Sequence, residues 1–270
     1  DIKLKPVKSN LIDLIWKNRP KKLISSPFKL PLNFHGEEKS LKIKKIIRYI
    51  ETSKKDACIL TSCDTICWLF NIRAQDLEYS PLIMAKSIIH RDGSCFIFSD
   101  QKTLKNETLN SKIKIIYKPL HHFDSHFNEY KDSIGSYLCA PNDTSFNVVM
   151  LIKEIGAKVI FKDNIVDILK AKKNTTEENG MRNAHIRDGV ALTKFIYWIK
   201  NTKNNSQTEI SASNYLDKLR SKNENFFSLS FPTIAGSGPN GAIVHYRASN
   251  KTNRKLKKDD LFLVDSGAQY

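Results

Sequence analysis

Two residues near the end of the chain have types and surroundings that could support metal-assisted hydrolysis. Asp265 follows the apolar run 261–264 and precedes the segment Ser266–Tyr270. A carboxylate at the end of a buried strand is costly to desolvate unless it is paired or binds a metal ion. His245 lies earlier, inside the short apolar segment 241–247, which is predicted to be a second strand. Together they indicate the opening pieces of a metal-hydrolase site, and the chain ends before a complete site could be assembled.

Each of these residues also has an ordinary structural interpretation. His245 could be a strand histidine whose ring is satisfied by its neighbours. Asp265, Ser266 and Gly267 could form an Asx turn that ends a strand. Taken alone, each residue is better explained by its structural interpretation. A metal-hydrolase interpretation therefore depends on the segments around the two residues.

The segment 236–241 matches the dinucleotide-binding pattern G-x-G-x-x-G by its letters. That pattern requires a helix that opens at the third glycine and points its N-terminus at the pyrophosphate. Here Pro239, Asn240 and Gly241 form a turn signal, and a strand is predicted to follow it. The context therefore argues against a dinucleotide site.

Other potential metal ligands are given structural interpretations. The segment His121–His126 is predicted to be a polar loop without cysteine partners or a supporting helix, and therefore a solvated surface cluster. Cys58, Cys63 and Cys67 lack C-x-x-C spacing and lie in an apolar stretch, which favours buried thiols. The basic segment 251–258 is predicted to be a solvated hairpin tip.

Composition restricts the class of partner. The formal net charge is +16, but the basic residues are mostly Lys and are spread along the chain, and the abundance of Lys, Ile and Asn indicates an AT-rich coding bias. Because no motif typical of nucleic-acid recognition accompanies the charge, we expect no nucleic-acid partner. No run of about eighteen apolar residues is present, so no membrane partner is expected.

The cysteines and the first residues bear on location. Five cysteines without a paired framework fit a reducing compartment, so we expect a cytoplasmic protein. Residues 1–5 contain neither an initiator Met nor an apolar signal core. We therefore expect the chain to begin within a longer protein.

Three regions are predicted along the chain. Residues 1–36 are basic and interrupted by prolines, which predicts a connector with a short helix near 11–16. Residues 37–170 alternate helices and strands, which predicts an α/β domain with a mixed sheet. Residues 171–270 contain two helices followed by antiparallel strands, which predicts an α+β architecture.

Apolar spacing predicts the elements of the middle region. Helices are expected over 41–50 and 145–155. Strands are expected over 57–60, 82–89, 95–98, 113–117 and 158–161.

In the third region, Thr175 and Glu178 are predicted to form a capping box that opens a long helix. The predicted core side of this helix comprises Met181, Ala184, Val190, Ala191, Phe195, Trp198 and Ile199. A second helix is expected over 209–221, followed by strands over 226–231, 241–246 and 261–265.

Several of these segments resemble a known family, the three-domain Xaa-Pro aminopeptidases (aminopeptidase P). The segment 64–73, with Asp76, Tyr79 and Pro81 after it, resembles the family's middle-domain signature, and Ala74 stands where a glycine is usual. Segments 208–212, 229–234, 238–246 and 263–270 resemble successive blocks of its catalytic domain. The segment 10–16, followed by Arg19 and Pro20, is similar to the linker that leaves its first domain.

The resemblance implies a creatinase-like α/β domain with a mixed sheet, followed by the incomplete first part of an α+β pita-bread domain. In that family two divalent ions, usually Mn2+, activate a bridging water that attacks the bond before proline. Asp265 matches the first metal-bridging carboxylate, and His245 matches a histidine that binds the substrate. The resemblance places the remaining ligands, one Asp, one His and two Glu, beyond Tyr270.

We therefore expect a fragment of an Xaa-Pro aminopeptidase that is truncated at both ends and inactive alone, because one carboxylate cannot hold two ions. Its expected partners are proline-containing peptides. Two alternatives remain: a half-enzyme complemented by a separate C-terminal chain, and a non-catalytic peptide-binding or homodimerisation module.

Overall fold

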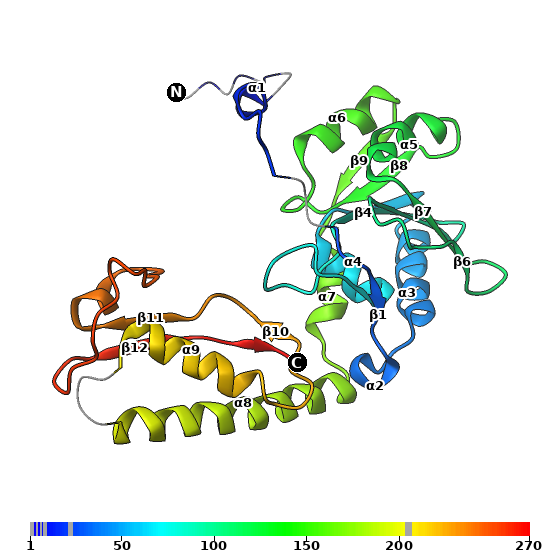
Figure 1. The fold of residues 1–270 in the computed structure, drawn as a ribbon. Coiled ribbons are helices and arrows are strands. Elements are labelled where there is room, and N and C mark those ends of the chain that lie inside the picture. The colour runs from blue at the N-terminus through cyan, green and yellow to red at the C-terminus, as the bar shows by residue number, and fades with distance from the viewer. Residues whose placement is uncertain (1–2, 4, 6, 8–9, 21–23, 203–206) are drawn as a thin grey trace.

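Apolar strand segments of the middle region assemble into one seven-stranded sheet, seen in the right-hand lobe of Figure 1. The computed structural model describes residues 3, 5, 7, 10–20, 24–202 and 207–270. The strand order is β6-β7-β5-β4-β2-β8-β9. The strands are β2 (Ala57–Leu60), β4 (Ala85–His90), β5 (Ser94–Ser99), β6 (Glu107–Thr108), β7 (Lys114–Lys118), β8 (Ser136–Cys139) and β9 (Lys158–Phe161).

The sheet is mixed, as predicted. Strands β5 and β7 run parallel, as do β2 and β8 and also β8 and β9. The other neighbouring pairs, β2 with β4, β4 with β5 and β6 with β7, are antiparallel. Strand β2 is buried along its whole length, which agrees with its continuously apolar sequence, and β4 is buried except at Lys86.

Helices cover both faces of this sheet. Helices α3 (Lys39–Thr52), α4 (Cys63–Phe70) and α7 (Ile165–Ala171) pack on one face, around a core that includes Ile43, Ile66 and Val166. Helices α5 (Phe123–Glu129) and α6 (Phe146–Glu154) pack on the other face. The predicted helices over 41–50 and 145–155 are thus confirmed, whereas α4, α5, α7 and β8 were not predicted.

The expectation for His121–His126 is wrong. This segment forms a short 3-10 helix, η1 (Leu120–His122), and the start of α5, and His126 is completely buried. His126 Nε2 lies 3.1 Å from Nε2 of His90, which is also buried. Phe96 and Tyr130 pack against both rings. The helix turns His126 inward because its apolar neighbours Phe123 and Phe127 face the same core.

The buried histidine pair predicts acid sensitivity. Burial lowers the pKa of His90 to about 4 and that of His126 to about 3. Between about pH 6.5 and pH 4 the unfolded chain therefore binds protons that the folded chain does not. The free energy of unfolding should fall as the pH falls through this range, by up to roughly 1.4 kcal/mol per pH unit for each histidine.

Urea unfolding at several pH values measures this slope. His126→Leu should flatten it, whereas His122→Gln, at an exposed position of the same segment, should leave it unchanged. Equal slopes in all three proteins would contradict the assignment of the acid sensitivity to the buried pair.

The first region contacts both lobes. It contains α1 (Leu11–Ile15), as predicted, then β1 (Phe28–Lys29) and α2 (Leu32–His35). Strand β1 pairs with β3 (Ile72–Arg73) of the middle region. Helix α2 contacts α8 (Thr175–Asn201), which opens the second lobe.

The second lobe combines two helices with antiparallel strands, as predicted, and the strands form two separate pairs (Figure 1). After α8 come α9 (Glu209–Arg220), β10 (Ser228–Leu229), β11 (Ile234–Ser237), the 3-10 helix η2 (Gly238–Ala242), β12 (Phe262–Asp265) and β13 (Ala268–Gln269). Strand β10 pairs with β13, and β11 pairs with β12. A small core of Phe195, Ala212 and Leu216 joins α8 to α9 and to β12.

Two local predictions for α8 need correction. The capping box exists, but it is formed by Asn174 and Glu177, one residue before the predicted pair. Of the predicted core side, Ala191 and Phe195 are buried, whereas Met181 and Val190 are exposed. The helix therefore presents a narrower buried stripe than its sequence suggested.

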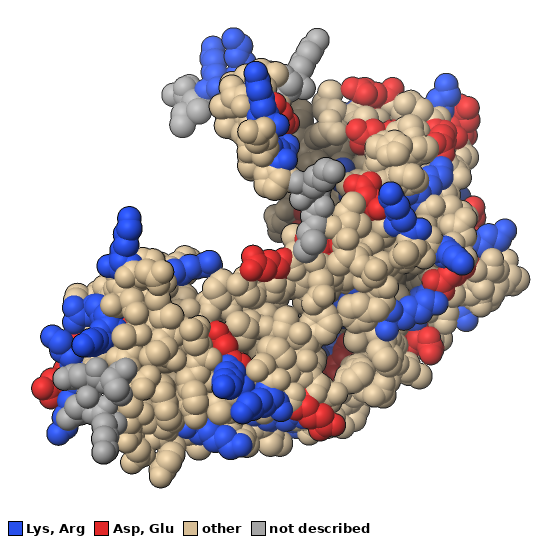
Figure 2. Space-filling model, viewed as in Figure 1, with Lys and Arg blue, Asp and Glu red and all other residues tan. Residues whose placement is uncertain are grey.

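The distribution of charged residues and the burial of the cysteines agree in part with the predictions from the sequence. Figure 2 shows Lys and Arg over both lobes, with Asp and Glu between them. Cys58 and Cys67 are buried, and Cys63 is partly exposed. Within the described part of the chain, no helix combines the length and the apolarity that crossing a membrane requires.

Candidate functional site

Asp265 is the last residue of β12 and lies opposite Ile234 of β11. Strand β12 is half-exposed rather than buried, and the Asp265 side chain is exposed. Among the described residues, no hydrogen bond or ion pair reaches its carboxylate. The Asx-turn interpretation therefore has no support in the hydrogen bonding of this side chain, and both carboxylate oxygens are free to bind a ligand.

His245 occupies a different setting from the one predicted. The expected strand over 241–246 is wrong, because η2 occupies residues 238–242 and a turn follows it. His245 is exposed in this turn and has a φ of 53°. This left-handed conformation is uncommon for a residue with a side chain, although histidine is among the types that adopt it more often. Within the described structure, the ring makes no hydrogen bond, and no ion pair joins it to Asp265.

The turn folds back because two glycines allow close backbone contact. A Cβ atom on Gly236 would lie 2.9 Å from the backbone nitrogen of Gly241 and 3.0 Å from the Asn240 carbonyl carbon. Only glycine fits at such a distance. The G-x-G-x-x-G letters thus reflect packing of η2 against β11, and no α-helix opens at Gly241.

A buried carboxylate holds this turn in place. Glu209, the first residue of α9, is completely buried. It accepts hydrogen bonds from the backbone amides of Ser237 (2.7 Å) and Arg254 (3.0 Å). It also accepts hydrogen bonds from the Asn240 side chain (3.0 Å) and the Tyr246 hydroxyl (2.9 Å). Glu209 therefore ties the segments on both sides of His245 to the start of one helix.

The hydrogen bonds decide the charge of Glu209. Burial alone would raise its pKa, but the donated hydrogen bonds, led by the amides of Arg254 and Ser237, outweigh burial and lower the pKa. The helix N-terminus favours the same charge. Glu209 is thus an anion with its acceptors occupied, which suits it to a structural role rather than to proton transfer.

A second carboxylate fixes the end of the described chain. Asp188 of α8 forms a two-pronged ion pair with buried Arg220 of α9, with both N–O distances at 2.8 Å. The Tyr270 hydroxyl also donates to Asp188, at 2.9 Å, and accepts from the Asn223 side chain at 3.1 Å. These hydrogen bonds hold Tyr270, the last residue of the segment that follows Asp265.

The described residues do not by themselves form a metal site. Within the described ranges, no group of three or more His, Cys, Asp or Glu side chains is arranged to hold a metal ion. Asp265 offers the hard oxygen donors that divalent cations such as Mn2+ prefer. It fits one position in such a site, but a two-ion site requires further ligands.

Three residues that shape this region, Glu209, Tyr246 and Arg220, were not predicted from the sequence. Glu209 lies within the segment 208–212 that carries the family resemblance, yet its role depends on donors distant in sequence. The signal that could have found it is an acidic residue directly after Thr208, which caps α9.

Comparison with known proteins agrees with this architecture. Residues 18–177 match the creatinase/prolidase N-terminal domain, and residues 179–270 match metallopeptidase family M24. The chain therefore belongs to the creatinase/prolidase family, and its last part matches the metallopeptidases of family M24.

Similar proteins extend along nearly the whole chain. A probable Xaa-Pro aminopeptidase P of Laccaria bicolor is 33% identical over 99% of this chain and 42% of its own length. One from Paracoccidioides brasiliensis is 34% identical over 98% of this chain and 45% of its own length. The solved X-prolyl aminopeptidase of Caenorhabditis elegans, a cytosolic enzyme with a di-nuclear active site, is 28% identical with a TM-score of 0.88, and the match covers 98% of this chain and 44% of that one. The chain thus spans less than half the length of these relatives.

Proposed function

We propose that this chain is part of a dinuclear-metal Xaa-Pro aminopeptidase, which releases the N-terminal residue from peptides with proline in second position. In this proposal Asp265 is a metal ligand and His245 binds the substrate. Residues 1–270 alone do not catalyse the reaction. We assign residues 1–36 to a linker, 37–170 to the creatinase-like domain and 171–270 to part of the pita-bread domain.

The observation that carries the proposal is the free carboxylate of Asp265 in the segment that matches family M24. Three other carboxylates of this lobe have partners: Asp188 binds Arg220, Glu209 binds its four donors, and Asp260 pairs with Arg254. Asp259 is exposed like Asp265, but it lies in a turn and does not end a strand. An unpaired carboxylate at a strand end has an acceptor capacity that the fold itself does not use.

The chemistry that bound divalent ions supply in such a site is activation of water and polarisation of the scissile carbonyl. Mn2+ is the ion proposed, since carboxylate ligands suit it. The residues of this chain provide an oxygen ligand at Asp265, a ring at His245 for the substrate and a frame that fixes both segments. A cytoplasmic location, as described for the nematode enzyme, is part of the proposal.

Activity assays test the proposal on two proteins. The first is chain 1–270, and the second is the same chain continued by the C-terminal part of the Laccaria bicolor relative that lies beyond the matched region. Only the continued chain should release the N-terminal residue of an Xaa-Pro peptide with Mn2+. Asp265→Asn should reduce its kcat/KM by at least about a hundredfold, because the asparagine lacks the ligand charge.

A control variant and two further measurements accompany the activity assay. Asp259→Asn, at another exposed carboxylate of the lobe, should retain activity. Mn2+-dependent release by chain 1–270 alone, or an Asp265→Asn enzyme with full activity, would contradict the proposal. If activity appears when the two parts are mixed as separate chains, the half-enzyme alternative gains support. Size-exclusion chromatography of chain 1–270 tests the possible homodimer.

A further inference from the structure

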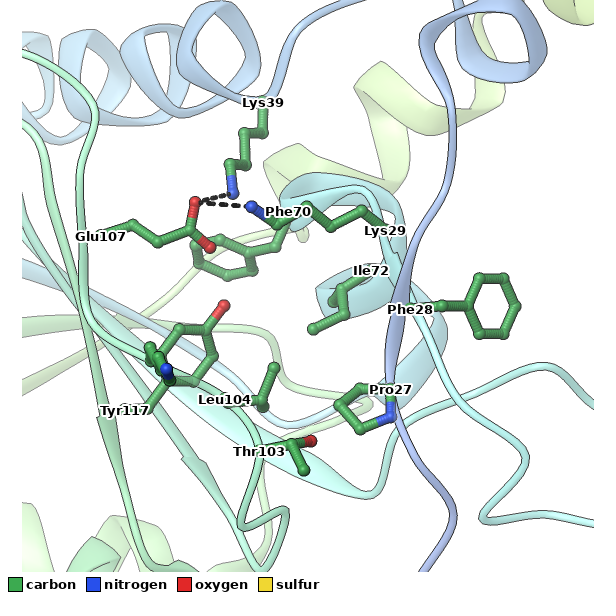
Figure 3. A pocket seen from close by; sticks show the side chains of 11 residues that line it. Pro27, Phe28, Lys29, Lys39, Phe70, Ile72, Thr103, Leu104, Glu107 and Tyr117 are labelled. Atoms are coloured by element: carbon green, nitrogen blue, oxygen red, sulfur yellow. Dashed lines mark hydrogen bonds and ion pairs between the residues drawn. The ribbon is translucent and has the colours of Figure 1, made fainter.

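A cavity of about 310 Å³ opens in the creatinase-like lobe (Figure 3), and neither Asp265 nor His245 lines it. It lies where β1 and β3 meet the start of α3, the edge strand β6 and its neighbour β7. This volume falls at the lower end of the range for small-molecule sites. The cavity is therefore large enough for a compact organic molecule.

One wall of the cavity is apolar and firmly packed. Phe70 and Ile72 belong to the buried core, and Leu104 packs against that core. The ring of Phe28 turns away from the cavity (Figure 3) and lies 5.6 Å from the ring of Phe227, which leaves the space in front of Ile72 open. A ligand with an apolar body would bury carbon surface here without displacing a side chain.

The opposite side carries an excess of positive charge. Lys39 Nζ lies 2.6 Å from Glu107 Oε2, and Lys29 Nζ lies 3.3 Å from the same oxygen (Figure 3). Glu107 thus serves two ammonium groups with one carboxylate. Lys105 adds a third cation to the lining. Among the residues lining the cavity, positive charge exceeds negative charge by two.

The ammonium group of Lys39 is shielded from solvent, which strengthens its attraction for an anion. Its side chain is only 13% exposed, whereas that of Lys29 is 74% exposed. An ammonium group has three hydrogen-bond donors, and within the described structure the Lys39 ammonium uses one of them, toward Glu107. A partly desolvated cation with free donors favours a second anion.

We propose that this cavity binds a small organic acid. The carboxylate of the ligand lies between Lys29 and Lys39, and its apolar body lies against Phe70, Ile72 and Leu104. A cationic ligand is disfavoured because it would meet the excess positive charge. This site is independent of the proposed peptidase activity, since none of its residues belongs to the lobe that holds Asp265.

Calorimetric titration of chain 1–270 with 3-phenylpropionate tests the site. The uncharged 3-phenylpropanamide, which has the same apolar body, is the matched probe. The acid should bind, and the amide should bind at least about tenfold more weakly, because a charged hydrogen bond is lost. Raising the salt concentration should weaken binding of the acid only.

Two substitutions should act in opposite directions. Lys39→Met should weaken binding of the acid about tenfold or more, since it removes the least exposed cation. Glu107→Gln should strengthen binding several-fold, because the ligand no longer competes with a protein carboxylate for the lysines. Lys153→Met, at an exposed position of α6 on the other face of the sheet, should leave binding unchanged.

The outcomes separate the possibilities. Thermal unfolding verifies that each variant is folded, and Lys29→Met at the cavity rim replaces Lys39→Met if the latter does not fold. Equal binding of acid and amide, or weaker binding of the acid after Glu107→Gln, would overturn the proposal. Preferential binding of 3-phenylpropylamine would assign the cavity to a cation instead, and would also overturn it.

Discussion

Replacing Arg220 by Met should lower the free energy of unfolding by about 3–5 kcal/mol. The Arg220 side chain is 2% exposed, and it meets Asp188 through two N–O contacts of 2.8 Å. Removing the cation leaves the Asp188 carboxylate partly buried with only the Tyr270 hydroxyl as donor. Because the pair joins α8 to α9, the loss should appear as a lower midpoint in urea unfolding of chain 1–270.

Two comparisons isolate the cause of this loss. Arg182→Met removes an exposed pair with Glu178, whose side chains are 68% and 50% exposed, and should cost less than about 0.5 kcal/mol. Combining Arg220→Met with Asp188→Asn should recover part of the stability, because asparagine carries no charge and still accepts from Tyr270. If Arg220→Met costs no more than Arg182→Met, the buried pair does not stabilise the lobe.

Glu209→Gln should lower the free energy of unfolding by about 2–4 kcal/mol at pH 7, although the two side chains are nearly equal in size. The carboxylate accepts from Ser237, Asn240, Tyr246 and Arg254. A glutamine amide has one oxygen to accept with, and its NH2 group would face these donors. At least one buried donor would then lack a partner, which costs more than the hydrogen bond itself contributes.

The effect of Glu209→Gln should depend on pH in a defined direction. The pKa of Glu209 is lowered in the folded state, so its contribution to stability is present above the ordinary pKa of 4.5 and is lost as the pH falls through the folded value. The difference between the parent chain and the variant should therefore shrink below about pH 4.5.

The control for Glu209→Gln is Glu224→Gln, at a side chain that is 80% exposed. This substitution should change the free energy of unfolding by less than about 0.5 kcal/mol, both at pH 7 and below about pH 4.5. Hydrogen exchange adds a local measurement, since the amides of Ser237 and Arg254 should lose protection in Glu209→Gln. Unchanged protection of both amides would contradict the role assigned to this carboxylate.

Elements whose patterns are local could be predicted from the sequence. The apolar spacing in 41–50 and the apolar runs at 57–60 and 158–161 predicted α3, β2 and β9 at nearly their observed limits. The blocks of the third region resemble the catalytic domain of the Xaa-Pro aminopeptidases, and residues 179–270 match metallopeptidase family M24. Helices and short strands can be predicted in this way because residues a few positions apart decide them.

Features that join distant segments depend on how the whole chain folds. His126 appeared solvated in the sequence, but α5 buries it against His90, which lies in β4. The segment 241–246 has a strand-like composition, yet it has no strand partner, because η2 packs back on β11 through Gly236 and Gly241. A strand requires a neighbour to satisfy its backbone, and local sequence does not specify that neighbour.

The candidate site shows the same division. The sequence identified Asp265 and His245 by type and context, and their roles remain proposals. It could not show that Glu209 would secure the turn that carries His245, because its donors come from residues 237–254, brought together by folding. Residue types thus indicated the chemistry, whereas long-range hydrogen bonds and burial decided which charges the fold satisfies and which, as at Asp265, it leaves free.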